Sequence, residues 1–220
     1  PSAVKVCANF PETVQYLPEG KAVLTGTPIR RELFAGNRIR GLEFCGFRAD
    51  RPVILVVGGS TGALAVNEAV RNLLPTLLKR FQVVHLCGKG KTDNAYANIG
   101  GYVQYEYISA ELSDLFAAAD IVISRAGANA VCELLALRKP MILIPLSAAA
   151  SRGDQILNAE SFERQGFAYV INEESLTNET LLTAVNKVYD ERDGYIHAMK
   201  ESKLTDATET IVRLIEETIL

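Results

Sequence analysis

Short apolar runs alternate along most of the chain with glycine-bearing turns and amphipathic stretches. Eight short runs are predicted strands, at residues 4–8, 22–25, 53–57, 83–87, 103–107, 121–124, 141–144 and 168–171. Several are apolar at nearly every position, which is typical of strands covered on both faces. Five stretches have the apolar spacing of helices, at residues 63–80, 111–119, 128–137, 155–164 and 176–190. This alternation predicts an α/β fold with a Rossmann-like parallel sheet and helices on both faces.

The chain divides into three parts that differ in local composition and in the secondary structure that they predict. In residues 1–50, glycine and proline interrupt every apolar run, which predicts a linker-like segment with two short strands and no long element. The first strong strand follows Pro52, so a compact α/β unit is predicted over residues 51–193. Residues 194–220 show no further strand pattern and are predicted to form one or two helices.

Composition places the chain among globular proteins. Its 220 residues suit one domain, and 48% hydrophobic with 22% charged residues is ordinary for a chain that buries a core. The formal net charge of -3 provides no basic field for nucleic acid. The four cysteines form no CxxC pair, which indicates free thiols in a reducing compartment. His85 and His197 are the only histidines, which excludes a histidine-rich zinc site.

No apolar window approaches the roughly 20 residues that are needed to cross a bilayer. The first residues also lack the basic patch, apolar run and small-residue cleavage site of a signal peptide. The protein is therefore expected in the cytoplasm. This expectation is compatible with a peripheral contact between the protein and a membrane.

Residues 58–63 (GGSTGA) follow a predicted strand and open a helix. Small residues let the backbone approach a ligand closely, and a helix N-terminus offers unpaired N–H groups to an anion. The placement favours a cradle for phosphate or diphosphate over a plain turn.

Residues 90–92 (GKT) look like the end of a P-loop, but His85 occupies the place of the required glycine and no helix follows. A nucleotide-hydrolysing role is therefore rejected.

Two later segments lie at predicted junctions between a strand and a helix. In residues 124–133 (SRAGANAVCE), Gly127 and Ala128 open a helix, and the Glu133 carboxylate could accept two hydrogen bonds from a vicinal diol such as a ribose. Spacing alone favours a solvated helix glutamate at Glu133. Asp154 and Gln155 suit sugar hydroxyls, although Asp154 could equally cap a helix.

Five segments in this order carry a family resemblance: residues 25–30 (TGTPIR), 58–63, 106–108 (EYI), 124–133 and 154–159 (DQILNA). Together they resemble the C-terminal half of the MurG-like enzymes of glycosyltransferase family 28, which have the two-domain GT-B fold. The resemblance implies that residues 51–193 bind the donor UDP-N-acetylglucosamine. It also implies an inverting hexosyltransferase that passes N-acetylglucosamine to undecaprenyl-diphospho-muramoylpentapeptide in peptidoglycan synthesis.

The resemblance assigns roles to individual residues. Arg30 and Ser60 would contact the diphosphate, while the Ile108 backbone would bind uracil beside Tyr107. Glu133 would bind the ribose, whereas the spacing of the residues alone favoured a solvated helix glutamate. The predicted donor-site residues are Arg30, Gly59, Ser60, Thr61, Gly62, Tyr107, Ile108, Gly127, Ala128, Asn129, Ala130, Glu133, Asp154 and Gln155. No obligatory metal is expected, since the sequence has no Asp-x-Asp motif, and no cofactor is expected beside the substrate UDP-N-acetylglucosamine.

The family's N-terminal glycine-rich loop, whose histidine is thought to supply the base, has no match in this chain. His85 is predicted to be a core strand residue, so no catalytic residue is predicted here. The base and the site of the lipid-linked acceptor are expected in an N-terminal domain that contacts the cytoplasmic face of the membrane. The chain alone is expected to bind the UDP-sugar without transferring it, and a start at Pro1 rather than Met fits that expectation.

Two further interpretations stay open. The chain could be a natural split subunit that docks on a membrane partner, as in the eukaryotic dolichol-linked transferase. It could instead be a UDP-sugar-binding domain without catalysis, or one related to UDP-N-acetylglucosamine 2-epimerases. The epimerase alternative is disfavoured because only two poorly placed histidines are available.

Overall fold

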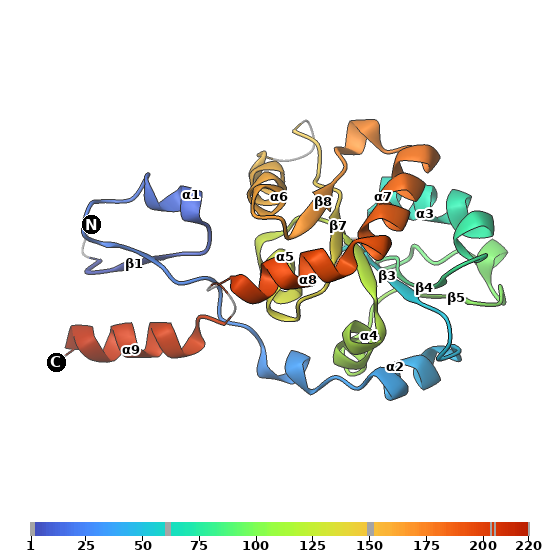
Figure 1. The fold of residues 1–220 in the computed structure, drawn as a ribbon, viewed down its shortest axis with the longest axis horizontal. Helices are drawn as coiled ribbons and strands as arrows, with labels where there is room; N and C mark the ends of the chain where they lie inside the picture. The colour runs from blue at the N-terminus through green and yellow to red at the C-terminus, as the bar shows by residue number, and fades with distance from the viewer. Residues whose placement is uncertain (1–2, 60–62, 149–151, 203, 205, 220) are drawn as a thin grey trace.

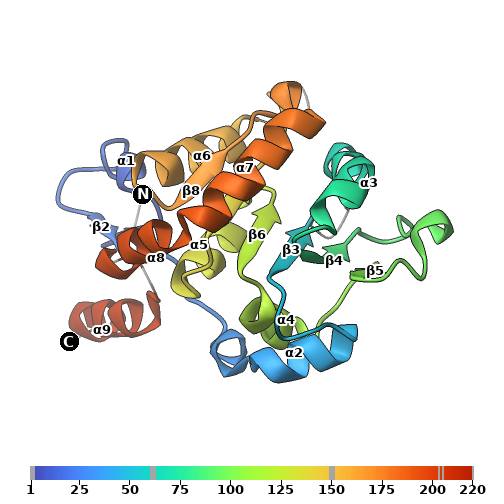
Figure 2. The ribbon, with the colours of Figure 1, turned by 45° about the vertical axis from the view of Figure 1, so that its right-hand side comes forward.

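The computed structural model describes residues 3–59, 63–148, 152–202, 204 and 206–219. Its body is a parallel six-stranded sheet with the strand order β5-β4-β3-β6-β7-β8 (Figures 1 and 2). These strands are β3 (Val53–Val57), β4 (Gln82–Leu86), β5 (Tyr102–Tyr105), β6 (Ile121–Ser124), β7 (Met141–Leu143) and β8 (Ala168–Val170). A separate pair, β1 (Val6–Ala8) and β2 (Ala22–Leu24), is also parallel. All eight predicted strands are thus confirmed.

Helices follow most of the strands. They are α1 (Pro11–Val14), α2 (Arg38–Cys45), α3 (Leu64–Leu77), α4 (Leu112–Ala118), α5 (Ala128–Ala136), α6 (Asp154–Arg164), α7 (Asn178–Asp190), α8 (Arg192–Glu201) and α9 (Thr208–Ile219). Short 3-10 turns add η1 (Arg31–Ala35), η2 (Asn94–Tyr96) and η3 (Glu173–Ser175). The five predicted helices and the helical C-terminal part are confirmed.

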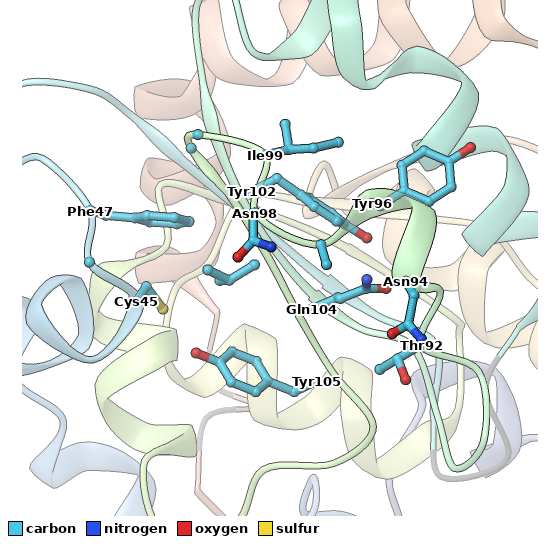
Figure 3. Close-up of a pocket in the computed structure, with 15 residues that line it drawn as sticks. Cys45, Phe47, Thr92, Asn94, Tyr96, Asn98, Ile99, Tyr102, Gln104 and Tyr105 are labelled. Carbon is cyan, nitrogen blue, oxygen red and sulfur yellow. The ribbon is translucent and has the colours of Figure 1, made fainter.

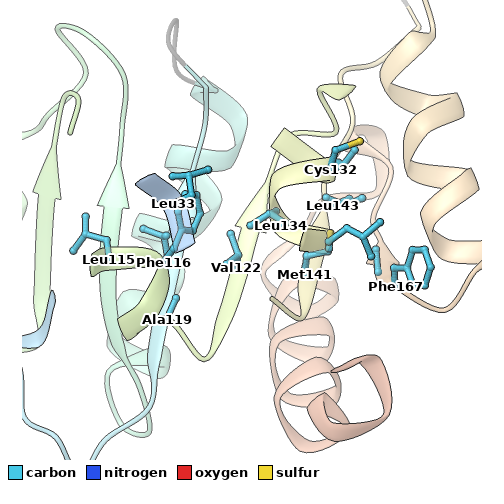
Figure 4. Packing of buried hydrophobic residues seen from close by; sticks show 14 of the residues in the cluster. Leu33, Leu115, Phe116, Ala119, Val122, Cys132, Leu134, Met141, Leu143 and Phe167 are labelled. Atoms are coloured by element: carbon cyan, nitrogen blue, oxygen red, sulfur yellow. The ribbon is translucent and has the colours of Figure 1, made fainter. Parts of the chain in front are cut away.

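Both faces of the sheet are buried, which explains the continuous apolar strands. In β3, Ile54 and Val56 face a core made with α3 and α7, whereas Val53 and Leu55 face a core made with α2, α4, α5, α6 and α8. The side chains of a strand alternate between faces, so a strand covered on both sides must be apolar at every position. Figure 4 shows part of the second core, where Val122 of β6 and Leu143 of β7 lie near Leu134 of α5.

Helix α2 was not predicted from the sequence. Asn37 caps its start by accepting hydrogen bonds from two backbone N–H groups, and Gly46 ends it in the left-handed conformation. The sequence prediction treated Gly36 and Gly41 as interruptions, but they are sites of close packing. A Cβ atom at Gly41 would lie 2.3 Å from the Asp114 carbonyl oxygen, and one at Gly36 would lie 2.1 Å from that of Ser113. These glycines let α2 and the preceding turn approach α4.

The chain crosses twice between the small β1–β2 pair and the main sheet (Figure 1). The two crossing segments lie side by side, because Ala207 N–H donates to the Thr27 carbonyl at 3.2 Å and Ile29 N–H donates to Asp206 Oδ1 at 3.1 Å. Beyond this crossing, α9 follows the C-terminal segment and shares a hollow with β1 that Cys7 and Leu214 help to line. Residues 25–30 are therefore bonded to the C-terminal part of the chain before they reach the main sheet.

Gly41→Ala should lower the free energy of unfolding by about 2–3 kcal/mol, because the added Cβ meets backbone that cannot move aside. Gly194→Ala is the matched control inside a helix: nothing lies within 4 Å of its added Cβ, so a gain of about 0.5–1 kcal/mol is expected. Urea denaturation of both variants measures the difference. Equal effects at the two glycines would contradict the packing role of Gly41.

Candidate functional site

The strand order reverses in the middle of the sheet. Strands β3, β4 and β5 progress along the chain toward one edge, whereas β6, β7 and β8 progress toward the other. The reversal leaves β3 and β6 as neighbours, with Leu55 beside Val122. Loops that leave the carboxyl ends of these two strands diverge, and open α/β sheets bind ligands in the crevice between such loops.

Three helices that follow neighbouring strands begin without a side-chain cap. Ala63 precedes α3, Gly127 precedes α5 and Gly153 precedes α6, and none of these residues has a side chain that can accept a hydrogen bond. Helix α7 differs, because Thr177 and Thr180 form a capping box at its start. Helix N-termini that lack such caps at the carboxyl edge of a sheet suit an anionic group.

A narrow cavity of about 130 Å³ lies at the carboxyl ends of β3, β4 and β5, where α4 and α5 face the sheet. Its lining residues are Val57, Gly59, Leu86, Glu106, Tyr107, Ile108, Leu112, Phe116, Ala130, Glu133 and Leu134. Most are apolar, and Glu106 and Glu133 are the carboxylates among them. Such a cavity suits a small, largely apolar ring that has a polar group at one end.

Glu133 and Arg30 meet at this cavity. Arg30 Nε donates to Glu133 Oε1 at 3.0 Å, and the Arg30 side chain is 52% exposed while that of Glu133 is 18% exposed. This hydrogen bond raises the pKa of Arg30 above its ordinary value. Tyr107, which is 70% exposed, also lines the cavity. Segments far apart in the sequence thus bring a guanidinium, a carboxylate and an aromatic ring to one place.

The start of α6 is tied to the ends of two neighbouring strands. Gln155 Oε1 accepts from the Leu146 N–H at 3.1 Å, and Asn158 Nδ2 donates to the Ala126 carbonyl at 3.0 Å. Asp154 is the first residue of α6 and makes no capping hydrogen bond. The alternative prediction, that Asp154 caps the helix, is therefore wrong.

The structure gathers the described members of the predicted site around the crevice. Gly59, Tyr107, Ile108, Ala130 and Glu133 line the cavity, and Arg30 is bonded to Glu133. Gly127, Ala128 and Asn129 form the start of α5, while Asp154 and Gln155 form the start of α6. Ser60, Thr61 and Gly62 lie outside the described residues. What each of these residues binds stays a prediction.

Arg125, which lies in the segment of residues 124–133, is buried, and no role was predicted for it from the sequence. Its NH1 group donates to the Ile144 carbonyl at 3.0 Å and the Pro145 carbonyl at 3.2 Å, and NH2 pairs with Glu173. Arg125 therefore ties the carboxyl ends of β6 and β7 to η3. No local pattern could reveal this, since Glu173 lies 48 residues further along the chain.

A larger cavity, of about 680 Å³, lies beside the outer edge of β5 (Figure 3). It is lined from the loop before β5 and from the end of α2, and none of the predicted site residues contributes to it. Gln104 illustrates its chemistry: the side chain accepts from Asp93 N–H at 3.0 Å and donates to the Asp93 carbonyl at 2.6 Å. This amide is thus bonded within the protein's own loop, two strands away from the crevice.

The prediction that His85 is a core residue is confirmed, because its side chain is fully buried. Its Nε2 lies 2.9 Å from Asn67 Oδ1 and its Nδ1 lies 3.0 Å from the Tyr102 hydroxyl. Asn67 Nδ2 donates to the Cys87 carbonyl, so Asn67 Oδ1 accepts from His85. This arrangement fixes the neutral imidazole with its proton on Nε2, and Tyr102 donates to Nδ1.

The four cysteines are free, as predicted. Three of them are buried, and burial raises the pKa of the Cys45 thiol to about 12. Among the described residues, no three His, Cys, Asp or Glu side chains gather where they could hold a metal ion. No helix in the described part of the chain combines the length and apolar character that crossing a membrane requires.

A parallel sheet with small-residue helix starts at its reversal point defines an α/β domain of the Rossmann type. Residues 53–214 match the model of the glycosyltransferase family 28 C-terminal domain, and the chain belongs to this family. The family prediction made from the five segments is confirmed.

Two relatives are similar to the chain over nearly its whole length. The UDP-N-acetylglucosamine--N-acetylmuramyl-(pentapeptide) pyrophosphoryl-undecaprenol N-acetylglucosamine transferase of Lachnoclostridium phytofermentans is 76% identical over 217 residues, 99% of this chain and 61% of that protein. The protein of the same name from Lachnospira eligens is 61% identical over 98% of this chain and 61% of its own length. The chain thus spans about three fifths of the length of these relatives.

Solved structures support the same fold. Acinetobacter baumannii MurG superposes with a TM-score of 0.74 and 27% identity, covering 97% of this chain and 60% of that one. The calicheamicin glycosyltransferase CalG4 superposes with a TM-score of 0.66 and 16% identity over 97% of this chain and 52% of its own, a likeness of fold alone. The predicted Rossmann-like domain of a GT-B glycosyltransferase is confirmed.

The buried His85 makes stability depend on pH in a defined direction. Burial, with a smaller contribution from the Arg71 charge, lowers the pKa of His85 to about 3. The folded state therefore stays neutral at His85 while the unfolded chain takes up a proton below pH 6.5. Above pH 6.5, His85 is neutral in both states and costs the folded state no stability. As the pH falls from 6.5 toward 3, protonation of His85 in the unfolded chain lowers the free energy of unfolding by about 1.4 kcal/mol per pH unit.

Between pH 7 and pH 5, the unmodified chain should therefore lose about 2 kcal/mol more stability than His85→Gln, whose side chain does not titrate. Urea denaturation at the two pH values provides the comparison. Parallel losses in the two proteins would show that His85 is not held neutral by the fold.

Proposed function

We propose that this chain is the donor-binding part of an inverting hexosyltransferase and that it binds UDP-N-acetylglucosamine at the crevice between β3 and β6. The observation that carries the proposal is the position of Glu133, on the rim of an apolar cavity and beside the start of α5. A carboxylate there can bind a ribose while a ring enters the cavity and a diphosphate reaches the helix. The names of the close relatives support this donor.

The uracil ring would occupy the cavity. Leu112, Phe116 and Leu134 supply apolar surface for the faces of a flat ring. Ile108 lies just beyond β5, where its backbone can pair with the polar edge of uracil without requiring a particular side chain. The exposed ring of Tyr107 would cover the nucleoside from the solvent side.

The ribose and diphosphate would follow along α5. Glu133 can accept hydrogen bonds from both ribose hydroxyls. Its partner Arg30 uses Nε for this ion pair, which would leave the two terminal nitrogens of the guanidinium to bind the phosphates. The first turn of α5, at Gly127–Ala130, adds backbone N–H groups and the positive end of the helix dipole.

This arrangement would assist catalysis by stabilising the leaving UDP. Negative charge develops on the diphosphate as the bond to N-acetylglucosamine breaks, and preorganised N–H groups lower the barrier by binding that charge. The reaction also needs a base at the acceptor hydroxyl. Neither histidine can serve in the described crevice: His85 is buried in the core, and His197 lies on α8.

In the longer proteins of this family, the chain would act with an N-terminal domain that supplies the base. That protein would transfer N-acetylglucosamine to undecaprenyl-diphospho-muramoylpentapeptide at the cytoplasmic face of the membrane, as a peripheral enzyme of peptidoglycan synthesis. No metal, cofactor or nucleic acid enters the proposal. The chain alone would bind UDP and its sugar without transferring the sugar.

Glu133→Gln should weaken UDP binding by roughly 10- to 100-fold, because the charged acceptor for the ribose hydroxyls is lost. Binding of 2′-deoxy-UDP, which has one hydroxyl fewer, should change much less. Calorimetric titration of the chain with both nucleotides measures this difference. Glu68→Gln, at an exposed carboxylate on α3, is the matched control and should bind both nucleotides normally. Equal weakening for UDP and 2′-deoxy-UDP would count against the ribose contact.

In a full-length protein that contains this chain, Glu133→Gln should raise the KM for UDP-N-acetylglucosamine by about 10-fold or more and leave the KM for the lipid-linked acceptor unchanged. Transfer of labelled N-acetylglucosamine to undecaprenyl-diphospho-muramoylpentapeptide measures both constants. A change confined to the acceptor KM would contradict the assignment of this part of the chain to the donor.

A further inference from the structure

The cavity of about 680 Å³ in Figure 3 lies along β5, which is an edge strand of the main sheet. All four residues of β5, Tyr102–Tyr105, line this cavity, together with the end of α2 and parts of the loop before β5. Four strand residues span about 13 Å, so the cavity follows the whole length of the strand. It has no lining residue in common with the cavity that would hold the nucleoside.

The free edge of β5 carries open backbone groups. β5 pairs with β4 alone, and the carbonyls of Gly101 and Tyr105 accept hydrogen bonds from β4. Backbone groups alternate in direction along a paired strand, so the N–H and C=O of Gln104 and the C=O of Tyr102 point away from β4. The Tyr102 N–H donates to the Ile99 carbonyl at 3.0 Å. Among the described residues, none forms a hydrogen bond with the three groups that point outward.

The opposite edge of the sheet is covered by the protein itself. In β8, the Ile171 N–H donates to the Leu143 carbonyl of β7 at 3.0 Å, so the Val170 N–H points outward. Glu163 of α6 accepts from this N–H at 3.3 Å. Charged side chains, proline or a bulge also protect edges from other chains. β5 has no charged residue or proline, and its register with β4 has no bulge. The edge of β5 is thus open, whereas that of β8 is covered.

Contacts within the protein hold the walls of the cavity in place. The Gln104 side chain accepts from the Asp93 N–H at 3.0 Å and donates to the Asp93 carbonyl at 2.6 Å. Arg71 NH2 of α3 donates to Gln104 Oε1 at 3.1 Å. On the other wall, the rings of Phe44 and Tyr105 stack with their centroids 5.4 Å apart. The cavity is therefore formed before a ligand arrives, which reduces the entropy lost on binding.

The chemistry of the cavity selects an uncharged ligand. None of its described lining residues carries a charge, although 22% of the residues in the chain are charged. A charge buried there would lack a partner, which costs free energy. Rings and amide side chains dominate the lining, from Phe47, Asn94, Tyr96, Asn98, Tyr102 and Tyr105. Tyrosine and asparagine are residues that antibodies use to contact other proteins, because they give adaptable contact at low entropic cost.

An open strand edge beside a cavity for side chains is the arrangement that binds peptides by strand addition. We infer that the edge of β5 binds an extended, uncharged segment of a partner polypeptide, which adds a seventh strand to the sheet. A sugar or a flat ring would use the side chains and leave the aligned backbone groups of β5 unpaired. The inference does not depend on the proposed function, because no predicted donor-site residue lines this cavity.

The test is an NMR titration of the isotopically labelled chain with an N-acetylated, C-amidated pentapeptide of alternating threonine and valine. The backbone N–H signal of Gln104 should shift as it gains a hydrogen bond, with a dissociation constant near about 1 mM. The same peptide methylated at every backbone nitrogen keeps its side chains but has no donors, so it should leave the signal unchanged. Maltotriose is the competing probe for a sugar site and should also leave the signal unchanged.

A pair of variants in the loop before β5 sharpens the result. Ala97 lines the cavity, whereas Ala95 lies two residues away in the same loop and does not, and both are exposed. Ala97→Lys should weaken the peptide about fivefold or more, because it brings a charge to the uncharged cavity. Ala95→Lys is the matched control and should bind the peptide like the unmodified chain.

Three outcomes of the titration would overturn the inference: no shift of Gln104 at about 10 mM peptide, equal binding of the methylated peptide, or shifts with maltotriose. Sedimentation of the chain without peptide tests whether a second copy fills the edge instead. The chain should sediment as a monomer at the concentration of the titration. A dimer that Ala97→Lys dissociates and Ala95→Lys does not would place a second copy on β5 and overturn the assignment to a partner polypeptide.

Discussion

The burial of β3 and β6 on both faces is the constraint on which the rest of the structure depends. A parallel strand without solvent on either side needs helices above and below it, and each crossover must return over one face. Three strands progress one way from β3 and three the other way from β6, which opens the crevice between them. The candidate site is therefore a consequence of how the core is buried, because the helices that cover the sheet begin at that crevice.

Contacts between distant segments hold this edge in shape. Arg125 joins the ends of β6 and β7 to η3, and the Arg30–Glu133 pair brings the early segment against α5. Glycines with no room for a Cβ bring α2 against α4, whose Phe116 forms part of the cavity wall. The linker-like first part of the chain thus contributes directly to the site, through Arg30 and through the packing beneath it.

The sequence predicted what local patterns encode. Short apolar runs, several of them continuous, identified every strand, and small residues between a strand and a helix identified the starts of α3 and α5. It missed α2, because a glycine needed for helix packing looks locally like one that ends a helix. The burial of Arg125 also depends on a residue far away in the sequence, Glu173. The spacing of the residues alone predicted that Glu133 is a solvated glutamate on a helix. Only the family resemblance assigned Glu133 to the site.

A crystal structure of the chain with bound UDP tests the central claim most directly. The account predicts the uracil ring in the cavity beside Ile108, the ribose hydroxyls about 3 Å from the Glu133 carboxylate, and the diphosphate at the start of α5. UDP in the cavity beside the edge of β5, or a nucleotide that leaves Glu133 without contact, would contradict the account.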